Sequence, residues 1–104
     1  QPRIKVPSPV KRGEVIEIRT LIRHPMESGY VRDSYGKLIP RNIITQFFCE
    51  LDGHEVFRAD LDTPTAANPY LSFHLRAEQS GTLTFTWVDE HGEELSETRA
   101  LEVT

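Results

Sequence analysis

The most regular feature of the sequence is an alternation of apolar and polar residues. In residues 14–23 it places Ile16, Ile18 and Ile22 on one side and Glu17 and Arg19 on the other. Successive side chains of a β-strand point to opposite faces, whereas a helix of about 3.6 residues per turn would scatter the isoleucines. Residues 70–77 and 82–88 alternate in the same way. The predicted inward side chains of these two segments are Leu71, Phe73, Leu75, Ala77, Leu83, Phe85 and Trp87.

Turn residues separate the predicted strands. Ser80-Gly81 lies between 70–77 and 82–88, so we expect those two strands to form a hairpin. A last strand continues to Val103, but Glu97 and Arg99 interrupt its apolar side, which is typical of an edge strand. A short strand is predicted at residues 3–6, before the prolines at positions 7 and 9.

Residues 42–61 predict a second hairpin, whose register decides which residues are exposed. A three-residue loop, Leu51-Asp52-Gly53, would pair Phe47 with Phe57 and give each face a consistent character. This register places the following residues inside: Ile43, Phe47, Cys49, Phe57, Ala59 and Leu61. It leaves Ile44, Phe48 and Val56 pointing outward.

These outward residues are the predicted contacts for a protein partner. Three neighbouring apolar side chains on a solvent face form the kind of patch that marks an interface. The 19-residue connection from His24 to Asn42 is long for a compact domain and adds Met26 and Tyr30 as further candidate contacts. A fold of this loop back over the sandwich is the alternative.

About seven short alternating strands and no long helical pattern predict an all-β, immunoglobulin-like antiparallel sandwich. A chain of 104 residues fits one domain, residues 1–104. The net charge of −4 argues against nucleic acid as a partner. No apolar run approaches the roughly 18 residues of a membrane span. The start of the chain shows no apolar signal core.

Catalytic chemistry finds little support in the residues. The four histidines are widely separated, and no motif for a metal, phosphate or hydrolase site is present, so we predict no catalytic residue, metal or cofactor. The strongest alternative is a thiol enzyme or redox sensor in which His74 activates Cys49. The inward position predicted for Cys49 favours a buried, unreactive thiol instead. Acidic pairs such as Asp89-Glu90 are interpreted as solvated turn and strand positions.

Several segments together resemble one family. They are Arg3-Ile4-Lys5-Val6-Pro7, the run from Gly13 to Gly29, Lys37 to Ile44, and Ala67-Asn68-Pro69-Tyr70. In this order they are similar to the SoxZ family of thiosulfate-oxidation proteins. The resemblance implies an immunoglobulin-like sandwich that forms a heterodimer with SoxY, giving the SoxYZ sulfur carrier of the periplasm.

In that family the sulfur intermediates are held by a cysteine in a Gly-Gly-Cys-Gly-Gly arm of SoxY. This chain ends in Leu101-Glu102-Val103-Thr104 and Cys49 lies between Phe48 and Glu50, so the carrier role is not transferred to Cys49. The resemblance implies a non-catalytic subunit that supports the SoxY arm and helps to offer it to other sulfur-oxidation enzymes. It also implies export to the periplasm together with the signal-bearing SoxY.

Two alternatives to the carrier subunit stay open at this stage. One is the thiol enzyme or redox sensor that uses Cys49. The other is a generic immunoglobulin-like binding module, which the inward parity of Phe85 and Trp87 disfavours. If the apolar patch exists, we also expect the isolated chain to form a homodimer through it.

Overall fold

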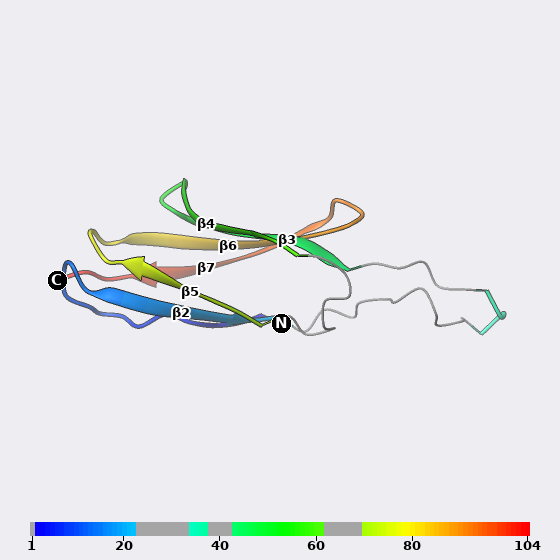
Figure 1. Ribbon diagram of the computed structural model, residues 1–104, viewed down its shortest axis with the longest axis horizontal. Coiled ribbons are helices and arrows are strands. Elements are labelled where there is room, and N and C mark those ends of the chain that lie inside the picture. The colour runs from blue at the N-terminus through cyan, green and yellow to red at the C-terminus, as the bar shows by residue number, and fades with distance from the viewer. Residues whose placement is uncertain (1, 23–33, 38–42, 62–69) are drawn as a thin grey trace.

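The structure, a computed structural model, describes residues 2–22, 34–37, 43–61 and 70–104. Within them two antiparallel β-sheets pack face to face (Figure 1). The three-stranded sheet has the order β1 (Arg3–Lys5), β2 (Val15–Leu21), β5 (Tyr70–Arg76). The four-stranded sheet has the order β4 (His54–Asp60), β3 (Ile44–Leu51), β6 (Gly81–Asp89), β7 (Glu94–Leu101). This arrangement confirms the predicted all-β sandwich. None of the described residues form a helix long and apolar enough to span a membrane.

β2 is the central strand of the three-stranded sheet, and its alternation is preserved. Its ladder with β5 runs in one register, from Val15 opposite Arg76 to Leu21 opposite Tyr70. Ile16 and Ile18 are buried against the other sheet. The side chains between them lie on the outer face, because neighbouring residues of a strand point in opposite directions. The sequence pattern therefore predicts the two faces of this strand correctly.

The turn between β3 and β4 contains two residues, Asp52 and Gly53. Their φ angles are 49° and 85°, and Leu51 pairs with His54 across the turn. Two positive φ angles are what a type I′ turn requires, and Asp-Gly is a preferred sequence for it. The N–H of Thr82 donates a hydrogen bond of 2.9 Å to Asp52 Oδ1, which ties the turn to β6. The predicted three-residue loop is therefore wrong.

A β-bulge beyond this turn resets the pairing of β3 with β4. The register shifts between Cys49 and Glu50, so Cys49 pairs with Phe57 and Phe47 pairs with Ala59. The predicted pairing of Phe47 with Phe57 is wrong by two residues. Val56 is the extra residue on β4, and its insertion returns Phe57 to the inner face. The predicted inward set is thus correct although the register is not.

A second shift lies at the start of β3, in its ladder with β6. It falls between Ile44 and Gln46 and leaves Thr45 as the extra residue, whose hydroxyl donates to the carbonyl of Val88 at 3.3 Å. Ile43 and Ile44 are consequently both buried, and Ile44 is only 2% exposed. The predicted outward orientation of Ile44 is wrong, because the irregularity breaks the alternation there.

The predicted hairpin between residues 70–77 and 82–88 is also wrong. β5 pairs with β2, whereas β6 pairs with β3 and β7, so the connection between them crosses from one sheet to the other. Ala77 extends the β2 ladder by donating its N–H to the Glu14 carbonyl at 2.8 Å. Both strands turn their apolar side chains inward, and alternation alone does not distinguish strands that pair from strands that face each other across a core.

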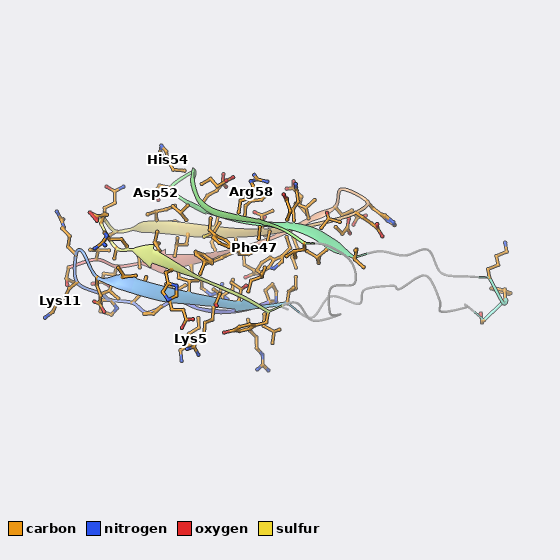
Figure 2. All side chains as sticks on the ribbon, in the orientation of Figure 1. Lys5, Lys11, Phe47, Asp52, His54 and Arg58 are labelled. Atoms are coloured by element: carbon orange, nitrogen blue, oxygen red, sulfur yellow. The ribbon has the colours of Figure 1, made fainter. Side chains whose placement is uncertain are left out.

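The core lies between the sheets and centres on aromatic rings. Phe47 lies between the two sheets (Figure 2) and is fully buried, and its ring centroid lies 5.2 Å from that of Trp87 and 6.1 Å from that of Phe57. Phe57 stacks on Phe73 of the opposite sheet at 4.5 Å. β7 is an edge strand, as predicted. Its Glu97 and Arg99, which lie opposite the core residues Phe85 and Leu83 of β6, form an ion pair of 3.3 Å.

Candidate functional site

Cys49 is placed where it cannot act as a nucleophile in the folded chain. It lies on the inner face of β3 and is 0% exposed. Burial, with a smaller contribution from the charge of Glu50, raises the pKa of its thiol to about 12. Because the thiolate is the reactive form, a thiol with this pKa remains protonated and inert at neutral pH.

The proposed partner of this thiol is on the wrong side of the molecule. His74 lies on the outer face of β5, exposed to solvent, while Cys49 lies inside the opposite sheet. The hydrogen-bonded Cys-His pair of a thiol enzyme is therefore not formed. Among the described residues no group of three or more His, Cys, Asp or Glu side chains is arranged to hold a metal ion.

Asp89 has a structural role at the end of β6. Its Oδ1 accepts hydrogen bonds from the N–H groups of His91 (2.9 Å) and Glu93 (3.0 Å), and its side chain is buried. A carboxylate that accepts backbone N–H groups in this way stabilises the tight turn into β7. The interpretation of Asp89 as a solvated residue is therefore wrong. The role that these hydrogen bonds give it is structural.

The predicted apolar patch on the four-stranded sheet is not formed. Ile44 is buried, and Val56, displaced by the bulge, packs against the core. Phe48 alone of the three remains on the outer face, half-buried, with the guanidinium carbon of Arg58 at 4.8 Å from its ring centroid. Arg58 is held over the ring by a 2.8 Å ion pair with Glu55. Met26 and Tyr30, the other predicted contacts, lie outside the described residues.

Apart from Val88 of β6 and Ala100 of β7, the remaining outer face of this sheet is polar. Phe48 lies opposite Thr86 of β6, and Thr86 shares a 3.0 Å hydrogen bond with Ser96 of β7. Glu50 lies opposite Thr84, and Gln46 lies opposite Asp60. Hydroxyl, amide and carboxylate groups thus surround the single outward phenyl ring.

The outer face of the three-stranded sheet has a different character, which we call the basic face. It comprises Arg3, Lys5, Val15, Glu17, Arg19, Leu21, Tyr70, Ser72, His74 and Arg76. Four arginine or lysine side chains accompany one carboxylate there. The residues of the four-stranded sheet carry the opposite excess, two arginines against six carboxylates. The sandwich therefore separates charge between its two layers.

The basic face also exposes apolar surface. Tyr70 is 57% exposed and Val15 is 52% exposed, at opposite ends of the β2–β5 ladder. A shallow hollow of about 180 Å³ is lined by Lys5, Pro7, Glu17 and Arg19. Sequence reasoning missed this face, because its cations come from strands far apart in the chain. The alternation in β2 gave part of the signal, and the pairing of β1 and β5 with β2 supplies the rest.

These features define the class of the protein: a two-layered β-sandwich whose distinctive features are its surfaces. The family model described as "Sulphur oxidation protein SoxZ" matches residues 4–100. The chain therefore belongs to the SoxZ family, which confirms the resemblance found in its sequence.

Solved structures agree on the fold. The superoxide reductase (neelaredoxin) of Ignicoccus hospitalis is similar with a TM-score of 0.73 and 18% sequence identity, over 99% of this chain and 80% of that chain. One variant of that protein gives a TM-score of 0.76, also at 18% identity, over 99% of this chain and 79% of that chain. At this identity the likeness concerns the fold alone. No curated protein matches the chain.

Proposed function

We propose that this chain is a non-catalytic subunit of the periplasmic SoxYZ sulfur carrier. In this role it binds SoxY and supports the presentation of the sulfur intermediates that the SoxY cysteine holds. Membership of the SoxZ family over residues 4–100 is the observation that carries the proposal.

The environment of Cys49 supports a division of labour between the two subunits. A carrier needs a thiol that can meet several enzymes in turn, and a nucleophilic thiol has to be exposed with a low or ordinary pKa. Cys49 has neither property, since it is fully buried and its pKa is raised to about 12. The reactive sulfur is then supplied by the partner, on its Gly-Gly-Cys-Gly-Gly arm.

Size-exclusion chromatography tests the heterodimer directly. This chain and a SoxY-type protein, mixed at micromolar concentration, are expected to co-elute as one species of their summed mass. Two separate peaks would contradict the proposal. The chain run alone gives its own oligomeric state. The reason for expecting a homodimer was the apolar patch, which the structure does not contain.

Phe48 remains the predicted SoxY contact on the four-stranded sheet. Phe48→Asp is expected to prevent co-elution, because it removes the apolar ring and puts a carboxylate, opposite Arg58, into an interface that has to desolvate it. Val15→Asp is the control: it makes the same kind of change, an apolar strand residue to aspartate, at an exposed position on the other sheet. Co-elution of the Phe48 variant would place the SoxY interface elsewhere.

Alkylation separates the carrier subunit from the thiol-enzyme alternative. The folded chain is expected to resist a maleimide at neutral pH and to react at once in denaturant, because Cys49 is buried and protonated. Rapid labelling of the native chain would support the alternative. Fractionation of cells that express both subunits tests location, and this chain is expected in the periplasm only when SoxY carries its signal.

A further inference from the structure

The ladders of the three-stranded sheet place like charges side by side on the basic face. Lys5 lies directly opposite Arg19, and both side chains point outward. Like charges at directly opposed positions destabilise an antiparallel sheet. Positions that break a local rule without a structural gain are candidates for function.

Little within the described residues neutralises this charge. Arg19 is paired with Glu17 through hydrogen bonds of 3.1 and 3.0 Å, and this contact raises the pKa of Arg19. Arg76 donates to the carbonyl of Gly13 at 2.9 Å, which satisfies a donor but leaves the charge. Neither Arg3 nor Lys5 has an ion-pair partner among the described residues. The face thus stays cationic in a chain whose net charge is −4.

The composition of the basic face is that of a protein interface. Tyr70 is a large exposed ring, and it lies in one cross-strand row with Leu21 and Arg3. Tyrosine and arginine are enriched among the residues that dominate binding energy, because they combine contact area with hydrogen bonding. The hollow beside Lys5 and Arg19 is a depression that a protruding side chain of a partner can enter.

We propose that the basic face is a second docking surface, which binds a carboxylate-rich protein surface on an enzyme that loads or unloads the carrier. Charge complementarity selects this occupant: cations spread over three strands match an extended acidic surface and steer its approach. The proposal rests on the proposed function, because it assumes that the chain is part of a carrier that enzymes visit.

Two other occupants fit the geometry less well. A small oxyanion such as thiosulfate would need enclosing donors, whereas the Arg19 side chain is 54% exposed and already bound to Glu17. A second copy could apply its acidic four-stranded sheet to the basic face. Such a contact joins two different surfaces, so it would continue into rings or open assemblies rather than close as a dimer.

Charge reversal at β1 is the test, carried out on the complete complex with a SoxY-type protein. The variant Arg3→Glu/Lys5→Glu is compared with Lys11→Glu/Arg12→Glu, which makes the same change of charge in an exposed turn at the end of the sandwich (Figure 2). Association and dissociation rates are measured against each loading and unloading enzyme at low and at physiological ionic strength. Cooperative melting curves and circular dichroism spectra like those of the wild type establish that the variants fold.

For at least one enzyme the β1 variant is expected to lower the association rate about tenfold at low ionic strength, with the turn variant close to wild type. Added salt should reduce the difference in association rate between the β1 variant and the wild type, because the Debye length falls to about 8 Å at 0.15 M and the charges are screened. Arg3→Gln/Lys5→Gln, which removes the charges without reversing them, should give an intermediate rate.

Four results would overturn the proposal. The first two are equal effects of the two charge-reversal variants on the association rates, and no effect of either variant with any enzyme. The third is calorimetric binding of thiosulfate that the β1 variant abolishes while the enzyme association rates stay the same. The fourth is salt-sensitive self-association of the wild-type complex in the absence of any enzyme. Co-elution with the SoxY-type protein is measured first for each variant. Loss of that co-elution would identify the basic face as the SoxY interface, and absence of it in the wild type would refute the proposed function instead.

Discussion

The two sheets of this sandwich differ in regularity. In the three-stranded sheet, β2 pairs with β1 and β5 without a register shift, and its side chains alternate strictly between the core and the basic face. In the four-stranded sheet, β3 carries a shift near each end, one against β4 and one against β6. Alternation in a sequence therefore reports the faces of a strand only where its ladders are regular.

The same difference separates the surfaces of the two layers. The regular sheet displays rows of arginine and lysine around exposed apolar groups. The irregular sheet withdraws Ile44 into the core, packs Val56 against it and presents mainly polar groups. Bulges here change which residues a partner can meet. Four predictions break or sharpen this comparison.

The largest effect is expected for the inner face of β3. Phe47→Ala should lower the free energy of unfolding by about 3–5 kcal/mol, because the ring is fully buried and truncation leaves a cavity. Phe48→Ala, its neighbour on the outer face, should cost no more than about 1 kcal/mol, mainly through the lost contact with Arg58. Urea unfolding of both variants measures the difference. Equal losses would mean that the faces of β3 are assigned wrongly.

The second prediction concerns the pH dependence of stability, which depends on Cys49, the inward residue next to the bulge in the irregular sheet. In the unfolded chain its thiol loses its proton near pH 9.0, whereas in the folded chain the pKa is raised to about 12. Between these values the unfolded state binds fewer protons than the folded state, so the free energy of unfolding falls as pH rises. Below pH 9.0 the thiol is protonated in both states, and its contribution to stability is fully present.

The expected slope is about 1.4 kcal/mol per pH unit within that window. Urea unfolding of the wild type and of Cys49→Ala across the window isolates this contribution, since the variant lacks the thiol and should lose the extra slope. A parallel pH dependence of the two proteins would show that the thiol is more accessible than its position on β3 indicates.

These residues also show how far the sequence determines the answer. The strands, most of their inward residues and the family were predictable, because alternation and the ordered segments are local signals. The register of β3 with β4 was not, since it depends on a bulge at Val56 that follows from packing against the opposite sheet. The β5–β6 pairing failed for a similar reason: facing each other across a core and pairing in one sheet require the same inward residues.

The candidate site divides along the same line. The burial of Cys49 was predicted from its parity and is confirmed. The apolar patch was inferred by extending a regular alternation through two irregular points, so it lost two of its three residues. The basic face depends on β1, β2 and β5 lying side by side, which links residues more than fifty positions apart. No local pattern contains that information.

The turn that starts the irregular hairpin gives the third prediction. Gly53→Ala should cost about 1–2 kcal/mol, because φ is 85° at this position and a Cβ disfavours the left-handed region even though no atom blocks it. Asp52→Asn is the control and should change stability by less than about 0.5 kcal/mol. Asparagine also favours this turn, and its amide oxygen can still accept the Thr82 N–H. Thermal unfolding measures the stability of both variants. A Gly53→Ala variant as stable as the wild type would refute the turn assignment.

The smallest effect concerns the regular sheet, where stability and binding should respond in opposite directions. Lys5→Glu replaces a like-charge pair opposite Arg19 by an attractive one, so the melting temperature should rise, by up to about 2 °C at low salt. Lys5→Gln, which only removes the repulsion, should give a smaller rise, and added salt should reduce both.

A gain in stability from the change that weakens docking would mean that Lys5 is kept at a structural disadvantage, as expected for a residue that serves binding. A fall in melting temperature would instead show that Lys5 stabilises the sheet, and its position opposite Arg19 would then no longer indicate a role in binding. The measurement is sensitive because β1 has only three residues and, within the described part of the chain, pairs with β2 alone, so its contribution depends on each cross-strand pair.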